Sequence, residues 1–138
     1  MRKLGIDYGE SRVGIAMTDP LNITAQGFET IQRNGSDKIV LRRLDEILSQ
    51  YEIDTIVVGM PFNLKGEKTV RAEITEKFIH KLKCKYNKLK IETIDERLTT
   101  VAAHKTMNFL DINKNKKRDI VDTISAVYIL ESYINKKN

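Results

Sequence analysis

The chain has 138 residues, of which 41% are hydrophobic and 31% charged, which is the balance of a single globular domain over 1–138 rather than of a disordered chain. Lysine and arginine exceed aspartate and glutamate by five, which favours an anionic partner, while one cysteine and two histidines argue against a disulfide or a structural zinc site. No stretch is apolar enough to span a membrane and Asp7 interrupts the first apolar stretch, so we expect no secretory signal and a cytoplasmic protein.

The first part of the chain predicts three antiparallel strands and a helix. Apolar residues alternate over 2–8 and, after a glycine turn, over 13–17, and a third strand is expected over 22–32. The period then changes. Apolar residues three or four positions apart predict a helix over 36–50, with the serine at its start as the N-cap and Ile39 on its buried face.

The second part of the chain alternates strands and helices. The predicted elements are a buried strand at 55–58, a helix at 69–84, a strand at 89–95 and a helix at 100–109. A polar, basic loop over 111–118 is expected to precede a last helix that Asp119 caps and that ends near Ile134. Antiparallel strands followed by this alternation predict an α/β fold, a mixed five-stranded sheet flanked by helices.

Acidic residues lie where these elements end. Asp7 closes the first strand, Asp95 and Glu96 close the fifth, and Asp122 lies in the first turns of the last helix. Ligands of open α/β sheets bind at the carboxyl ends of the strands, so Asp7 and Glu96 can share an edge that Asp122 joins if the last helix packs there. Converging carboxylates need a cation between them, and oxygen ligands favour Mg²⁺ or Mn²⁺. Two such ions would clamp the attacking water and the leaving oxygen of a phosphodiester.

Each acid alone also has an ordinary structural explanation. Asp7 could form the turn, Glu96 could pair with Arg97, and Asp122 would be stabilised near a helix N-terminus without any function. Strand alternation does not decide between Asp95 and Glu96, because each face of that strand carries an apolar residue. The place of Glu96 at the very end of the strand and its longer side chain favour it as the second ligand.

The acids belong to a wider pattern in four blocks. These are Asp7-Tyr8-Gly9 with Arg12, Gly14 and Ala16; Val57-Val58-Gly59-Met60-Pro61 with Asn63 and Gly66; Asp95-Glu96-Arg97-Leu98-Thr99-Thr100; and Lys117 with Asp122-Thr123-Ile124-Ser125-Ala126 and Ile129-Leu130. In this order they resemble the YqgF family, described as Holliday-junction resolvases and as nucleases maturing pre-16S ribosomal RNA. The resemblance implies an RNase H-like fold, with Asp7, Glu96 and Asp122 as the catalytic acids.

Basic residues are candidates for holding a nucleic-acid backbone. These candidates are Arg97, Lys65 and the run Lys116, Lys117 and Arg118. The run precedes Asp122, so phosphate contacts there would hold a backbone over the acids. Arg97 could neutralise charge that develops on the transferred phosphoryl group, while Lys65, like Arg71, flanks a loop and could add a phosphate contact. Lysines at helical spacing over 77–88 are more typical of a solvated face.

The expected partner is RNA or branched DNA, including a precursor of the small ribosomal subunit, and the expected protein is a monomer or a homodimer. Two other functions stay open. One is a non-catalytic nucleic-acid or ribosome-binding module of the same fold. The other is an ATPase of the actin and sugar-kinase type, which shares the Asp-x-Gly hairpin at Asp7 but clamps its nucleotide between two domains.

Overall fold

The computed structural model describes residues 1–63, 65–96 and 114–137, with 114–122 and 137 described as backbone only. The elements in chain order are β1 (Arg2–Tyr8), β2 (Arg12–Thr18), β3 (Ala25–Gln32), α1 (Asp37–Gln50), β4 (Ile53–Met60), α2 (Val70–Lys85), β5 (Lys90–Asp95) and α4 (Lys114–Lys137). The helix expected over 100–109 and the candidate Arg97 lie outside the described residues. None of the described helices has the length and apolar character needed to cross a membrane.

The strands form one five-stranded sheet in the order β3-β2-β1-β4-β5. The hairpin pairs β1/β2 and β2/β3 are antiparallel, whereas β1/β4 and β4/β5 are parallel. This is the mixed sheet that the sequence predicts. Because β1, β4 and β5 run in the same direction, their carboxyl ends lie at one edge of the sheet, where ligand sites of such folds are found.

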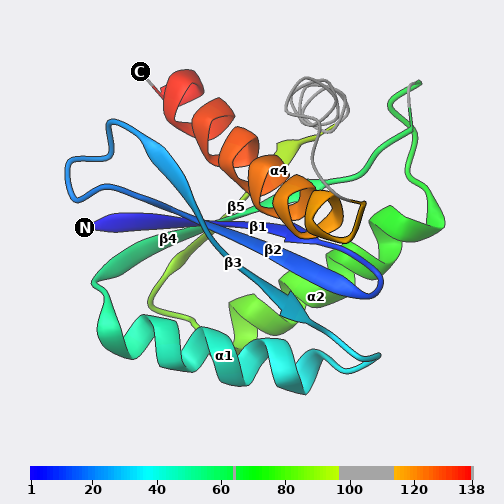
Figure 1. Cartoon of the computed structure of the whole chain (residues 1–138), viewed down its shortest axis with the longest axis horizontal. Coiled ribbons are helices and arrows are strands. Elements are labelled where there is room, and N and C mark those ends of the chain that lie inside the picture. Colours follow the sequence, from blue (N-terminus) through cyan, green and yellow to red (C-terminus); the bar gives the residue numbers. More distant parts are fainter. Residues whose placement is uncertain (64, 97–113, 138) are drawn as a thin grey trace.

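Helices cover both faces of the sheet, with α4 on one face and α1 and α2 on the other (Figure 1). Each face has its own core, since neighbouring strand residues point to opposite sides. Leu4 and Ile6 belong to the larger core under α1 and α2, whereas Ala16 and Val57 belong to the core under α4. At Gly5 the backbone of α4 comes very close, because an added Cβ would lie 2.9 Å from the carbonyl oxygen of Ala126.

Capping residues fix where two of the helices begin. The Ser36 side chain accepts a hydrogen bond from the backbone N–H of Lys38, and α1 starts at the next residue after this cap, as predicted. The Thr69 side chain does the same for Ala72 at the start of α2. The buried face of α1 differs in one position from the prediction: Val40 is fully buried, whereas Ile39 is 37% exposed.

The predicted start of the last helix is wrong. Instead of a loop that continues to residue 118, the helix α4 begins at Lys114. Lysine and arginine are good helix formers and 114–118 contains neither glycine nor proline, so the polar composition did not require a loop. The basic run therefore forms the first turns of α4.

The third strand also begins later than predicted, at Ala25 instead of residue 22. The carboxylate of Asp19 accepts hydrogen bonds from the backbone N–H groups of Leu21, Ile23 and Thr24, at 3.2, 2.8 and 2.7 Å. These bonds hold the segment as a turn, because aspartate bonded to nearby amides offers the backbone an alternative to the sheet.

Candidate active site

Asp7 and Glu96 come together at the carboxyl edge of the sheet. Asp7 is the penultimate residue of β1, and Glu96 follows the last residue of β5. The backbone N–H of Glu96 donates to the carbonyl oxygen of Met60 at 3.2 Å, so strand pairing continues one residue beyond β5. Alternation then places Glu96 on the same face as the buried Ile94, the face that α4 covers, and leaves Asp95 exposed.

Gly59 in β4 leaves the space in which the Glu96 side chain reaches Asp7. The register pairs Ile6 with Val58, which puts Gly59 beside Asp7 on β4, the strand between β1 and β5. A Cβ at Gly59 would overlap Oε2 of Glu96 and would lie 2.6 Å from Cδ1 of Ile129. The carboxyl group of Glu96 therefore lies over Gly59, in space that any other residue would fill.

The two acids perturb each other strongly. Burial, together with the charge of Asp7 and a hydrogen bond to it, raises the pKa of Glu96 from 4.5 to about 8. Asp95 adds to this effect, and the positive charge of Arg71 opposes it. Without a cation, Glu96 therefore holds a proton at neutral pH. Asp7 and Glu96 both offer carboxylate oxygens, which are the donors that a hard divalent cation prefers.

Asp122 occupies a backbone position on the sheet-facing side of α4. It precedes Ala126 by about one turn and Ile129 by about two, and both of these residues are fully buried against the sheet. Thr123, the next residue, lies over Gly27 of β3. The Asp122 side chain is outside the description, and among the described side chains no three His, Cys, Asp or Glu residues form a metal-binding group. Asp7 and Glu96 are the two predicted ligands whose contact the structure describes.

The basic candidates are distributed differently. Lys65 is exposed in the loop between β4 and α2, at the same edge of the sheet as the acids. The positions of Lys116, Lys117 and Arg118 are in the first turns of α4. In contrast, two lysines of the 77–88 stripe are tied to α1: Lys81 bonds Asp37 at 2.7 Å and Lys85 bonds Asp45 at 2.8 Å.

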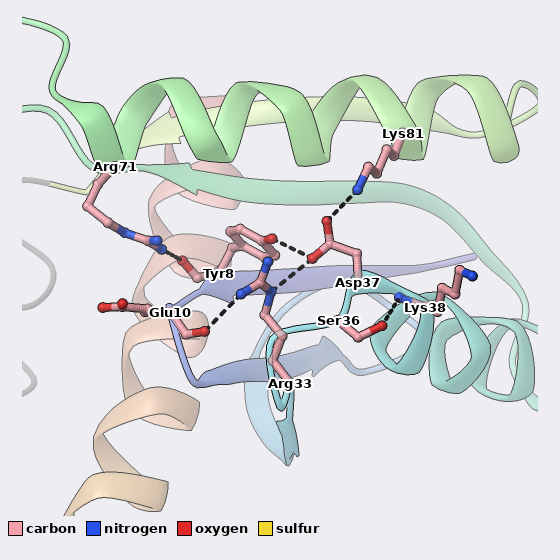
Figure 2. Close-up of polar contacts among 8 residues, drawn as sticks. All are labelled: Tyr8, Glu10, Arg33, Ser36, Asp37, Lys38, Arg71 and Lys81. Atoms are coloured by element: carbon pink, nitrogen blue, oxygen red, sulfur yellow. Dashed lines mark hydrogen bonds and ion pairs between the residues drawn. The ribbon is translucent and has the colours of Figure 1, made fainter.

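A polar cluster that the sequence analysis missed fixes the end of β1 from the opposite face (Figure 2). The hydroxyl of Tyr8 donates to Oδ1 of Asp37, which also accepts from Nε of Arg33 at 2.9 Å, while Oδ2 accepts from Lys81. Burial and the bond to Asp37 raise the pKa of Tyr8 to about 12. We call these four residues, Tyr8, Arg33, Asp37 and Lys81, the Asp37 cluster.

The Asp37 cluster also holds the turn after β1. Arg33 donates from Nη1 to the carbonyl oxygen of Glu10 at 3.0 Å, and its backbone N–H donates to the carbonyl oxygen of Ser11 at 2.8 Å. The Tyr8 ring stacks on Phe78 of α2, with 4.1 Å between ring centroids. Tyr8, which follows Asp7, and the turn after it are therefore fixed by tertiary contacts. The sequence shows a tyrosine directly after Asp7 and a capped start of α1, but it does not indicate that Tyr8 and Asp37 contact each other.

Comparisons with known proteins agree with this architecture. The structure is similar to the fowlpox virus Holliday junction resolvase, with a TM-score of 0.61 at 13% identity over 100% of both chains. It is also similar to Thermus thermophilus RuvC in complex with a Holliday junction substrate, with a TM-score of 0.56 at 12% identity over 100% of this chain and 96% of that one. The fold is thus the RNase H-like fold of resolvases, as the resemblance implied.

Sequence similarity identifies the family. The family model described as "RuvX: Holliday junction resolvase" matches residues 1–136. A protein of Ruminiclostridium cellulolyticum named "Putative pre-16S rRNA nuclease" is 50% identical over 136 residues, which are 99% of this chain and 95% of the relative. The chain belongs to the RuvX family, also called YqgF, a family of enzymes that hydrolyse phosphodiester bonds.

Proposed function

We propose that this chain is a divalent-metal-dependent nuclease in which Asp7, Glu96 and Asp122 bind Mg²⁺ or Mn²⁺. The observation that carries the proposal is the contact of Asp7 with Glu96 across Gly59, at the carboxyl edge of the parallel strands. Two carboxylates held in contact, one of them buried, destabilise each other unless a proton or a cation lies between them. The backbone position of Asp122, on the side of α4 that lies against the sheet, supports it as the third ligand.

The residues of the site have distinct tasks in this reaction. Asp7 and Glu96 supply carboxylate oxygens, and the proton that the pair holds at neutral pH must leave before both can act as ligands. A bound divalent ion would supply a nucleophile from water and would stabilise charge on the phosphate. The place of the Glu96 carboxyl group over Gly59 keeps one of the ligand groups in position beside Asp7.

The proposed substrate is a precursor of 16S ribosomal RNA, and the activity is placed in the cytoplasm, with a monomer or homodimer as the acting species. The support is the name of relatives that are 41–50% identical over nearly the whole chain. Resolution of a Holliday junction is the second candidate, supported by the description of the family. Base-specific reading is not required for either, since substrate shape can select the site of cleavage.

A cleavage assay tests both the reaction and the substrate. Wild type, Glu96→Gln and Glu92→Gln are incubated with a precursor 16S rRNA fragment or a four-way DNA junction, in Mg²⁺, Mn²⁺ or EDTA. The control residue Glu92 is a half-buried glutamate of β5, the strand that Glu96 directly follows. We expect metal-dependent cleavage by wild type and the control, and a loss of several orders of magnitude in Glu96→Gln. Tight binding without cleavage in any metal would instead indicate a non-catalytic binding module.

A further inference from the structure

Arg71 of α2 reaches the same edge of the sheet from the face opposite α4. Its Nη2 donates to the carbonyl oxygen of Tyr8 at 2.8 Å (Figure 2). Tyr8 directly follows Asp7 in β1, so the guanidinium group lies one residue from Asp7 along the strand. It is also close enough to Glu96 for its charge to act on that carboxyl group. One cation therefore lies near both of the acids that the structure brings into contact.

The surroundings of Arg71 hold its guanidinium group in place. The Cζ atom is 5.9 Å from the centre of the Tyr8 ring, and that ring is itself stacked on Phe78 and hydrogen-bonded to Asp37. A guanidinium group carries five N–H donors in a planar fork, and the bond to the Tyr8 carbonyl uses one of them. The group is thus fixed by rigid neighbours, and its contacts with the described residues leave N–H donors for an anion.

Arg71 differs in this respect from the cations of the described chain that are bonded to carboxylates. Arg33 and Lys81 are bonded to the carboxylate of Asp37, and Arg43 is bonded to Glu29 at 2.7 Å. Arg71 instead donates its hydrogen bond to a carbonyl oxygen. This acceptor carries no formal charge, so the bond does not neutralise the guanidinium group. Planar bidentate recognition of phosphate is the task for which arginine is better suited than lysine.

We propose that Arg71 binds the phosphate that is cleaved, through its remaining N–H donors, beside Asp7 and Glu96. The proposal rests on the nuclease function proposed above and adds a substrate-binding residue to it. The guanidinium group would place the phosphate over the acids and stabilise the negative charge that builds up on it in the transition state. Its bond to the Tyr8 carbonyl orients the group toward this task.

The first measurement is the salt dependence of binding, which does not require cleavage. Arg71→Gln, Arg71→Lys and the control Arg42→Gln are made in an Asp7→Asn background. Arg42 is an exposed arginine of α1, so its replacement makes the same change of charge away from the site. Binding of a labelled four-way junction and of a labelled RNA hairpin is followed by anisotropy. Arg71→Gln should lower the log–log slope by about one relative to the control, the amount expected for one lost phosphate contact.

The second measurement is the cleavage rate at saturating substrate in the otherwise wild-type protein. Removing one donor to a transition-state oxyanion lowers kcat by about 10²–10³-fold in known enzymes. We expect this loss of kcat for Arg71→Gln, a smaller loss for Arg71→Lys and no loss for Arg42→Gln.

An unchanged salt slope in Arg71→Gln would overturn the proposal, whatever happens to folding stability. So would a lower slope with an undiminished kcat, since the contact would then be with a distant phosphate. Absence of cleavage by wild type would refute the nuclease function instead, and the slopes would still test Arg71.

Discussion

Replacing Glu96 with glutamine should stabilise the metal-free protein at neutral and alkaline pH. In the folded chain the Glu96 carboxyl group is buried beside Asp7, and its pKa is raised from 4.5 to about 8. A raised pKa in the folded state means that stability is complete below about pH 4.5 and is lost as the pH rises through 8. Glutamine keeps the shape and the hydrogen-bonding capacity of the protonated acid without ever taking up the charge.

The size of the effect follows from the shift. A difference of 3.5 pKa units, between 4.5 and about 8, at ~1.36 kcal/mol per unit gives an upper bound of roughly 5 kcal/mol above pH 8. Solvent at the edge of the sheet and small movements of the two carboxylates reduce the cost of the charged pair. We therefore expect Glu96→Gln to be about 2–3 kcal/mol more stable than wild type at pH 9. At pH 5 the difference should be below about 0.5 kcal/mol.

Urea unfolding in EDTA at pH 5, 7 and 9 measures this difference for wild type, Glu96→Gln and the control Glu92→Gln. The control makes the same chemical change on the same strand, so its curve should remain parallel to that of wild type. Excess Mn²⁺ should then stabilise wild type more than Glu96→Gln, because the metal binds a site that the variant has lost. If wild type and Glu96→Gln lose stability equally between pH 5 and pH 9, the acids do not destabilise each other and the reasoning fails.

The remaining predictions concern the support of the site and its basic run. Gly59→Ala should lower the cleavage rate measured from initial rates by about 10²-fold, because its Cβ displaces the carboxyl group above it. Burial alone would raise the pKa of Asp37, but three hydrogen bonds hold this pKa below its ordinary value of 3.8. Asp37 therefore stabilises the fold above pH 3.8, and its contribution decreases as the pH falls below that value. Asp37→Asn should cost about 2 kcal/mol in urea unfolding at pH 7, against less than ~0.5 kcal/mol for the more exposed Asp54→Asn. Changing residues 116–118 to alanine should lower the log–log salt slope of binding by roughly three for a duplex and two for a single strand, and an unchanged slope would exclude this run from the interface.

Hydrophobic periodicity was sufficient to predict the five strands and the presence of α1, α2 and α4, although not all of their bounds. The strands and α1 have strong local signals, namely alternation in the strands and a serine cap before a regular apolar face. The start of α4 had none. Residues 114–118 are polar and can form either a loop or a helix, so their state depends on the helix that continues after them.

The candidate site could be predicted only in part, because its acids meet through residues far apart in the sequence. The end of β5 offered Asp95 and Glu96 on opposite faces, and the choice depends on α4, which covers only one of those faces. Likewise, Gly59 was visible as a glycine at the end of a strand, but nothing local indicates that the Glu96 carboxyl group fills its space. Contacts between elements decide both points.

The two faces of β1 have different roles in the candidate site. Because neighbouring strand residues point to opposite sides, Tyr8 enters the core under α1 and α2 while Asp7 lies on the face of α4. The Asp37 cluster and Arg71 hold Tyr8 by its hydroxyl group, its ring and its carbonyl oxygen, so they also fix the backbone that carries Asp7. The position of Asp7 is thereby determined from the face opposite the proposed metal site. Substitutions in the cluster should consequently change both folding stability and cleavage, whereas substitutions at Glu96 should raise the first and abolish the second.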